Sequence, residues 1–94
     1  MVDKATTARV TVRVRYFAAL REALGAEEQV EVAVGSTVGE LHAILRLRSE
    51  LHAQVLASSR PLRVALDHVV LETPDTACIS SPAEVAFFPP VTGG

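Results

Sequence analysis

The residues with the most evident chemical use lie at the end of the sequence, where Gly93 and Gly94 follow Pro89 and Pro90. Glycine has no Cβ, so a Gly-Gly segment can thread a channel too narrow for any side chain and take the φ that the channel imposes. The one functional group at such a tip is the α-carboxylate of Gly94. ATP-dependent adenylation makes a carboxylate oxygen a leaving group, and a sulfur or nitrogen nucleophile then gives a thiocarboxylate or an amide-linked conjugate. The sequence therefore predicts Gly94 as the reactive residue and Gly93 as part of its passage to the reaction site.

The segment before the glycines decides how this tail is presented. Pro89 and Pro90 have a fixed φ and favour an extended backbone, so they direct residues 91–94, including Val91 and Thr92, away from the body of the protein. A frayed end without a role is the alternative interpretation of the two glycines. We favour the reactive interpretation because the glycines follow a predicted strand and a stiff Pro-Pro pair.

Other residues that commonly do chemistry form no constellation along the sequence. His42 and His52 are ten residues apart, which is not the three- or four-residue spacing that brings two ligands together on a helix. Cys78 is the single cysteine and has no basic neighbour, so neither an intramolecular disulfide nor a multi-cysteine zinc site is expected. No glycine-rich phosphate loop precedes a helix. We therefore expect no metal and no stably bound cofactor, and we expect ATP to bind an activating enzyme rather than this chain.

The composition limits the classes of function. The chain has 94 residues, the size of one domain, and 49% of them are hydrophobic. A net charge of −2 offers no basic field for nucleic acid or an anionic membrane. No stretch approaches the roughly 18 apolar residues of a membrane span. Residues 1–8 lack the hydrophobic region of a signal peptide and are expected to form a flexible arm. We expect a cytoplasmic protein with no nucleic-acid partner and no membrane contact.

Alternating patterns predict the strands that hold the tail in place. In three of four segments, one residue parity is apolar and suits a core, while the other is mostly polar and suits a wet face. In the fourth, Val85 and Phe87 share one parity, and Ala86 and Phe88 share the other. The second segment, for example, places Val30, Val32 and Val34 on one face. Asp67 and His68 form a predicted turn into a short apolar run. The four predicted strands are 9–17, 29–34, 62–67 and 84–88.

Two helices are predicted between these strands. Residues 18–24 are strong helix formers, and Gly25 after them suits a left-handed C-terminal cap. Thr37 and Glu40 have the spacing of a capping box, and apolar residues follow at helical spacing. This second segment is the predicted main helix. The apolar residues of 51–56 leave open a further helical turn.

Together these elements predict a two-layer α+β domain spanning 9–90, in which a mixed sheet packs one face on the main helix. Residues 72–83 carry two prolines and are expected to be a loop. The unusual feature is the other sheet face, where Phe17 and Phe88 share a parity with charged residues. Exposed aromatic residues on a small domain often mark a contact surface. Drift of the parity at the strand ends, which would turn both rings into the core, is the alternative.

Three stretches resemble a known family. Val10 to Gly25, VTVRVRYFAALREALG, is similar to the first strand and helix of the MoaD/ThiS group of ubiquitin-like sulfur carriers. Ser36 to Leu45 is similar to the capped main helix of that group. Glu84 to Gly94, EVAFFPPVTGG, resembles its molybdopterin-synthase branch. The resemblance implies a ubiquitin-like β-grasp fold in which the first and last strands are central and the Gly-Gly tail stands clear of the body.

The resemblance also implies a reaction and its partners. Gly94 would be adenylated by a ubiquitin-activating-type (MoeB-like) adenylyltransferase that consumes ATP, and a sulfurtransferase would convert it to a thiocarboxylate. In the large (MoaE-like) subunit of molybdopterin synthase, the sulfur would pass to cyclic pyranopterin monophosphate during molybdenum cofactor biosynthesis. In the family, apolar groups on the outer sheet face and the tail contact that subunit. The matching positions here are Phe17, Val69, Phe88, Pro89, Pro90, Val91 and Thr92.

Some positions depart from the family pattern, and other functions share the same tail. Pro82-Ala83 stands where the family usually has Gly-Asp, the loop before it is longer than usual, and the turn near Asp67 lacks the usual Asn. A carrier for thiamine or cysteine biosynthesis would have the same Gly-Gly tip. A ubiquitin-like modifier would instead join Gly94 to lysine amines of target proteins. The Phe-Phe-Pro-Pro-Val-Thr approach favours the molybdopterin branch.

Overall fold

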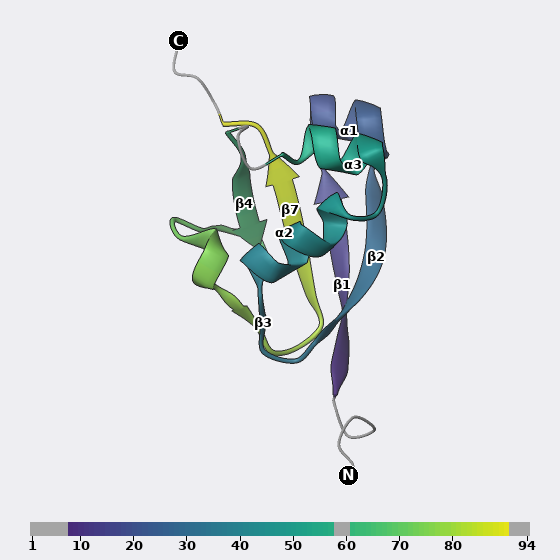
Figure 1. The fold of residues 1–94 in the computed structure, drawn as a ribbon. Helices are drawn as coiled ribbons and strands as arrows, with labels where there is room; N and C mark the ends of the chain where they lie inside the picture. Colours follow the sequence, from purple (N-terminus) through teal and green to yellow (C-terminus); the bar gives the residue numbers. More distant parts are fainter. Residues whose placement is uncertain (1–7, 58–60, 91–94) are drawn as a thin grey trace.

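A mixed five-stranded sheet, in the order β2-β1-β7-β4-β5, forms the centre of the fold (Figure 1). The structure is a computed structural model that describes residues 8–57 and 61–90. Most of the predicted arm, 1–7, and the predicted tail, 91–94, therefore lie outside the described residues. The strands of the sheet are β1 (Arg9–Tyr16), β2 (Glu27–Ala33), β4 (Arg63–Leu66), β5 (Val69–Val70) and β7 (Ala83–Phe88).

The first and last strands are neighbours within this sheet. β1 and β7 run parallel, with Tyr16 opposite Phe87, whereas β2 pairs antiparallel with β1, and β4 pairs antiparallel with both β7 and β5. This arrangement confirms the predicted mixed sheet with its first and last strands at the centre. Because β1 and β7 are parallel, the start of β1 and the end of β7 lie at opposite ends of the sheet (Figure 1). Pro89 follows β7 at the end of the sheet where β7 stops.

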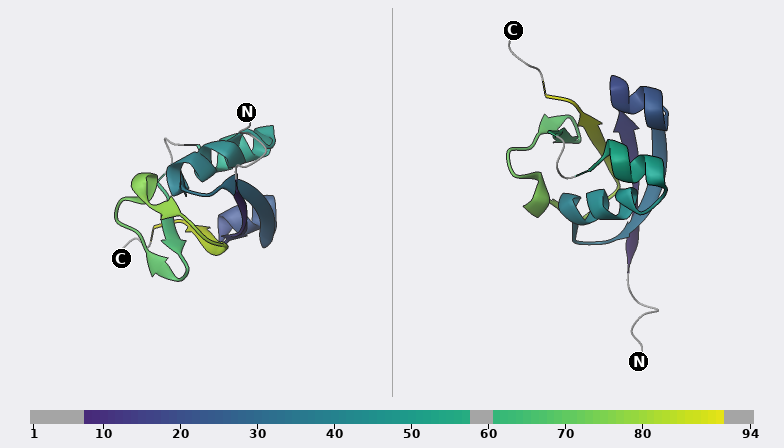
Figure 2. Two further views of the ribbon diagram at one scale, coloured as in Figure 1. Left: turned by 90° about the horizontal axis from the view of Figure 1, so that it is seen from below. Right: turned by 45° about the horizontal axis from the view of Figure 1, so that its top comes forward.

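The helices α2 and α3 cover one face of the sheet, and α1 lies at the end of the sheet where β1 stops (Figure 1 and Figure 2). The predicted capping box is present in α2: the Thr37 hydroxyl accepts a hydrogen bond from the Glu40 amide at 3.0 Å, and the Glu40 carboxylate accepts one from the Thr37 amide at 2.9 Å. The segment left open by the sequence forms a separate short helix, α3. Within the described ranges, no helix has the length and apolarity needed to cross a membrane. The helices are α1 (Ala19–Leu24), α2 (Val38–Arg46) and α3 (Glu50–Val55).

The core lies between the sheet and the helices α2 and α3. Tyr16 and Phe87 stack across the two central strands with their ring centroids 6.2 Å apart. The rest of the core is aliphatic, and one parity of each central strand faces it. Its aliphatic members include Val12, Val14, Val30, Val32, Val38, Leu41, Leu45, Leu56, Ile79 and Val85.

Three local predictions are wrong at the ends of elements. β2 ends at Ala33, so Val34 is not part of the buried face and is 45% exposed; the turn residue Gly35 has a φ of 91°. Gly25 has a positive φ of 95°, but its ψ of 171° is extended, so it is not the predicted left-handed cap. α1 begins one residue later than predicted because Ala18 has φ 57° and ψ −133°, which is not helical backbone.

Residues 72–83 contain more secondary structure than the predicted loop. They include a short 3₁₀ helix, η2 (Pro74–Thr76), and a strand, β6 (Cys78–Ile79), that pairs antiparallel with β3 (Ser36–Thr37). The Ile79 side chain is only 1% exposed and belongs to the core. A strand of two residues has no periodicity from which it can be predicted. β3 and β6 thus form a second, two-stranded sheet beside the start of α2.

The predicted turn at Asp67 and His68 is present and joins β4 to β5. Both residues have positive φ values, 48° and 73°, as the central residues of a tight hairpin turn do. The Asp67 carboxylate accepts a hydrogen bond from the Glu84 amide at 2.9 Å and so attaches the turn to β7. A two-residue turn also fixes the pairing of the strands, with Leu66 opposite Val69.

Candidate functional site

The end of β7 is the part of the described structure nearest in sequence to the two glycines. Phe88 is the last residue of β7, and Pro89 and Pro90 end the described range. The predicted tail begins at the next residue, so its roles stay predictions. The predicted site residues outside the described range are Val91, Thr92, Gly93 and Gly94.

Phe17 and Phe88 lie at the same end of the two central strands. Phe88 is partly exposed and faces away from the helices, whereas Phe87 beside it is fully buried. The Phe17 amide donates a hydrogen bond to the Phe87 carbonyl at 3.2 Å, and the Phe17 side chain is 37% exposed. Both rings therefore belong to the sheet face opposite α2 and α3, called the outer face below. This placement favours a contact surface over a drift of the parity into the core.

The strand register places one predicted contact residue on the other side. Val69 lies opposite Leu66, and Leu66 lies opposite the buried Val85. Directly opposed residues of antiparallel strands face the same side of a sheet. Val69 therefore belongs to the core side, at the sheet edge, where it is 63% exposed. Phe17 and Phe88 are brought to one face, and Val69 is not brought there with them.

Val70 takes the position on the outer face that was expected of Val69. It lies opposite Ala65 and is 47% exposed. Val70 was not predicted from the sequence. The two-residue turn before β5 was a usable signal, because such a turn determines which residues of the second strand face the same side as those of the first. The apolar residues of the outer face, in order across β5, β4, β7 and β1, are Val70, Ala65, Ala86, Phe88 and Phe17.

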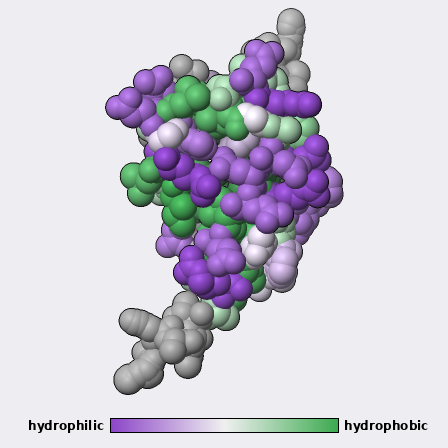
Figure 3. Space-filling view, turned by 90° about the vertical axis from the view of Figure 1, so that its right-hand side faces the viewer, coloured by the Kyte–Doolittle hydropathy of each residue, from purple (hydrophilic) through white to green (hydrophobic). Residues whose placement is uncertain are grey.

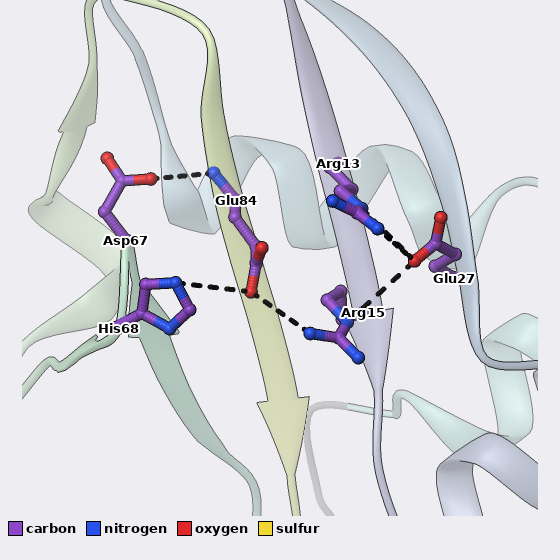
Figure 4. A network of polar contacts seen from close by, with 6 residues as sticks. All are labelled: Arg13, Arg15, Glu27, Asp67, His68 and Glu84. Atoms are coloured by element: carbon purple, nitrogen blue, oxygen red, sulfur yellow. Dashed lines mark hydrogen bonds and ion pairs between the residues drawn. The ribbon is translucent and has the colours of Figure 1, made fainter.

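Charged side chains cross the same face in paired contacts (Figure 4). A guanidinium N–H of Arg13 donates to the Glu27 carboxylate at 3.0 Å, and this contact raises the pKa of Arg13 above its usual value. Arg15 lies between two carboxylates, 3.9 Å from Glu27 and 3.7 Å from Glu84. His68 approaches Glu84 at 4.0 Å. The outer-face arginines on β1 are thus paired with glutamates.

Arg15 joins the charged part of the outer face to the apolar part. Its guanidinium carbon lies 5.3 Å from the centroid of the Phe17 ring, within the range of a cation–π contact. The sequence alone does not predict this role of Arg15, because the contact depends on the conformations of the Arg15 and Phe17 side chains. An apolar centre with a rim of paired charges has the composition of a protein–protein interface.

A second polar cluster, on the core side, ties α3 to the first two strands. Glu28 accepts hydrogen bonds from the Tyr16 hydroxyl at 2.6 Å and from His52 Nε2 at 2.9 Å, and Arg48 lies 3.0 Å away. Burial raises the pKa of Glu28, but these hydrogen bonds and the charge of Arg48 outweigh it, so the pKa lies below its usual value. Burial and the hydrogen bond to Glu28 raise the pKa of Tyr16. The cluster holds the end of β1 from which Phe17 projects.

The histidines and the cysteine lie apart from the outer-face patch, except for His68. His42 donates a hydrogen bond from Nε2 to the Leu56 carbonyl at 2.7 Å, and burial lowers its pKa. Cys78 is exposed and carries a free thiol. Across 8–57 and 61–90, no three histidine, cysteine, aspartate or glutamate side chains are grouped so as to hold a metal ion. Among the described residues, the outer face and the end of β7 therefore form the candidate site.

Comparison with known families settles the class of protein. The sequence profile of the ThiS family matches residues 14–94, which includes the end of β1, all of β7 and the two glycines. The chain belongs to the ThiS family. Its fold is the ubiquitin-like β-grasp that the resemblance implied, and the ThiS/MoaD group consists of ubiquitin-like sulfur carriers.

Solved structures with the same fold belong to proteins of different names. The HVO 2177 protein of Haloferax volcanii has a TM-score of 0.78 and 24% identity over 99% of this chain and 94% of that chain. SAMP1 from Haloferax volcanii has a TM-score of 0.63 and 25% identity over 89% of this chain and 99% of that one. In a complex of subunits 1 and 2 of the molybdopterin-converting factor from Helicobacter pylori, the matched chain has a TM-score of 0.63 and 19% identity, over 90% and 100% of the two chains.

Among curated proteins, no sequence matches this chain significantly. The ThiS family membership therefore rests on the family profile.

Proposed function

We propose that this ThiS-family chain is the sulfur-carrying small subunit of molybdopterin synthase. The Gly94 carboxylate attacks the α-phosphate of ATP in a ubiquitin-activating-type adenylyltransferase, and pyrophosphate leaves. A sulfurtransferase then delivers sulfur to the acyl adenylate, AMP leaves, and Gly94 becomes a thiocarboxylate. In the large subunit the sulfur passes to cyclic pyranopterin monophosphate, and water supplies the oxygen with which Gly94 returns as a carboxylate. Two such donations build the dithiolene of molybdopterin.

One observation carries this proposal: the family match extends through Gly93 and Gly94, which follow the Pro89-Pro90 pair after two residues, at the end of a central strand. The proposal takes Gly94 as the carboxyl-terminal residue. The Helicobacter pylori complex of two molybdopterin-converting-factor subunits supports a second subunit as the partner. We place the cycle in the cytoplasm, because each turn consumes ATP.

The outer face fits the partner-binding half of this role. Phe17 and Phe88 occupy the end of the sheet from which the chain continues toward Gly94, so a protein that receives the tail meets both rings on its approach. In the proposed complex this chain supplies a reagent and a docking surface. The groups that bind the pterin belong to the large subunit.

A ubiquitin-like modifier is the second candidate function. The likeness to SAMP1 from Haloferax volcanii, at 25% identity, supports it. Solved structures from Haloferax volcanii and Methanosarcina acetivorans bear the full name small archaeal modifier protein 1. In that role the activated Gly94 would be attacked by lysine amines of target proteins. A carrier for thiamine or cysteine biosynthesis would use the thiocarboxylate with a different acceptor.

Intact-protein mass spectrometry separates these functions. The purified chain is incubated with its adenylyltransferase, ATP and a sulfur donor, with and without ATP as the matched control. For a carrier we expect an ATP-dependent gain equal to the mass difference between sulfur and oxygen, located at Gly94. Isopeptide adducts on other proteins, without the thiocarboxylate, would contradict the carrier role. Capture of a pterin-binding large subunit by the thiocarboxylated chain would then favour the molybdopterin branch over the thiamine and cysteine branches.

A further inference from the structure

An apolar groove of about 350 Å³ lies at the end of the sheet where β7 stops. That volume is within the range of sites that hold small apolar groups, roughly 300 to 1,000 Å³. Every described side chain that lines the groove is apolar. The lining residues are Ala19 and Leu20 of α1, Val55 of α3, Pro61 and Leu62 before β4, and Pro89 and Pro90 after β7.

The wall of this groove is stiff and can be reached from outside. Three of the seven lining residues that the structure describes are prolines, whose φ is fixed, so little conformational freedom is lost when another group packs against them. Ala19 and Pro61 are exposed, and Val55 and Pro90 are partly exposed. Figure 3 shows one side of the molecule, where hydrophobic areas lie among many hydrophilic side chains. The groove is therefore a preformed surface that a partner's apolar side chain can fill.

The length of the remaining chain fixes how close such a partner must come. Gly94 is four residues beyond Pro90, and four extended residues span at most about 14 Å. An enzyme that acts on the Gly94 carboxylate holds it below its own surface, away from bulk water. The rim of that enzyme's channel must then lie closer to Pro90 than the full reach of the tail. Because Pro90 is itself a wall of the groove, the rim lies within that distance of the groove.

The groove also continues the outer face around the end of the sheet. Ala19 is two residues beyond Phe17, and Pro89 directly follows Phe88. A protein that covers both aromatic rings and receives the tail therefore passes over the groove's edge. The same neighbourhood argues against an unrelated ligand, since none of the described side chains that line the groove is polar and able to orient one.

We propose that the groove at Pro89-Pro90 receives an apolar side chain from the rim of the adenylyltransferase that activates Gly94. The inference rests on the proposed function and adds a second contact to it, separate from the outer face. Filling the groove from within this chain should then weaken recognition by the enzyme without touching the tail. It should also leave the core intact, because Ala19 is exposed.

The test compares two groove variants with a matched control. Ala19→Trp fills the groove, and Pro61→Asp places a charge in its wall. Ala53→Trp makes the same change as the first variant at an exposed position of α3 that does not line the groove. The measurement is the apparent KM for the carrier in ATP–pyrophosphate exchange by the adenylyltransferase, with thermal unfolding of each variant alongside. We expect KM to rise about tenfold or more in both groove variants, the scale of losing one well-packed interface anchor, and to change little in the control.

The possible failures are distinguishable. Absence of exchange with the unmodified chain would overturn the proposed function and this inference together. Normal exchange with the unmodified chain, and equally normal KM values for folded groove variants, would overturn the inference alone. A shift of the Gly93 and Gly94 NMR signals in free Ala19→Trp would place this chain's own tail in the groove, and a change from dimer to monomer would place a second copy there. Either result would also overturn the inference.

Discussion

Phe87 and Phe88 are consecutive residues of β7 with opposite surroundings. The Phe87 ring is completely buried, 6.2 Å from Tyr16 and 5.5 Å from the His42 ring between centroids. Phe88 lies on the outer face, at the same end of the sheet as Phe17. The two residues thus allow one substitution to be made once in the core and once on the proposed docking surface.

Phe88→Ala should weaken binding of the large subunit by about 2 kcal/mol or more, because aromatic anchors at interface centres commonly contribute that much. The free energy of unfolding should change little. Phe87→Ala is the control: it removes a buried ring and should destabilise the fold by about 3 to 5 kcal/mol. Chemical denaturation and titration calorimetry with the partner measure the two effects. If Phe88→Ala instead unfolds the domain while the folded fraction binds normally, Phe88 is not part of the docking surface.

His42 should make the domain less stable in mild acid. Burial lowers its pKa in the folded state, while an unfolded chain has a histidine pKa of about 6.5. Below that pH the unfolded state binds more protons than the folded state, so the free energy of unfolding falls as the pH falls. His42→Gln should flatten this dependence between about pH 6.5 and 5, whereas His68→Gln, at an exposed site, should preserve it. Equal slopes for His42→Gln and the unmodified chain, from denaturation at several pH values, would refute the assignment.

Much of the fold can be predicted from the sequence because its signals are local. The valine alternation of β1 and the capping box of Thr37 and Glu40 need no knowledge of tertiary contacts, and both predictions are confirmed. β6 lacks such a signal, since it is two residues long and is held by its pairing with β3.

The site was less predictable, because its geometry depends on residues distant in the chain. The parity of Phe17 and Phe88 indicated the outer face correctly. Val69 was assigned to it wrongly, because the family pattern was followed in place of the hairpin register that puts Val70 there. The contacts of Glu28 with Tyr16 and His52 join three elements and leave no pattern in the sequence.

Ala18→Gly should stabilise the domain. Ala18 has φ 57° and ψ −133°, a region that glycine enters far more easily than alanine, and the left-handed half of φ space disfavours L-residues by roughly 1 kcal/mol or more. Ala53→Gly is the matched control, in which the same change within α3 should destabilise by up to about 1 kcal/mol. Opposite signs in urea denaturation are the expected result. A loss of stability in both variants would show that the Ala18 backbone is not strained.

Gly93→Val should block thiocarboxylation, because a β-branched side chain cannot enter a channel that admits only glycine. Thr92→Val is the control, since it keeps a β-branched side chain of similar size one residue earlier in the tail. Mass spectrometry after reaction with adenylyltransferase, ATP and sulfur donor compares the two. Normal thiocarboxylation of Gly93→Val would show that the narrow-channel argument is wrong.

The most direct test of the account is a single-turnover sulfur transfer with the thiocarboxylated chain, the large subunit and cyclic pyranopterin monophosphate. The account predicts that molybdopterin forms while the Gly94 thiocarboxylate returns to carboxylate, with two carriers consumed for each dithiolene. A chain lacking Gly94 should give no product, because it lacks the residue that carries the sulfur, and it should stay folded, because the buried core cluster lies between Val12 and Phe87. Equal product from the chain lacking Gly94, or a thiocarboxylate that persists when the large subunit and pterin are present, would contradict the proposed function.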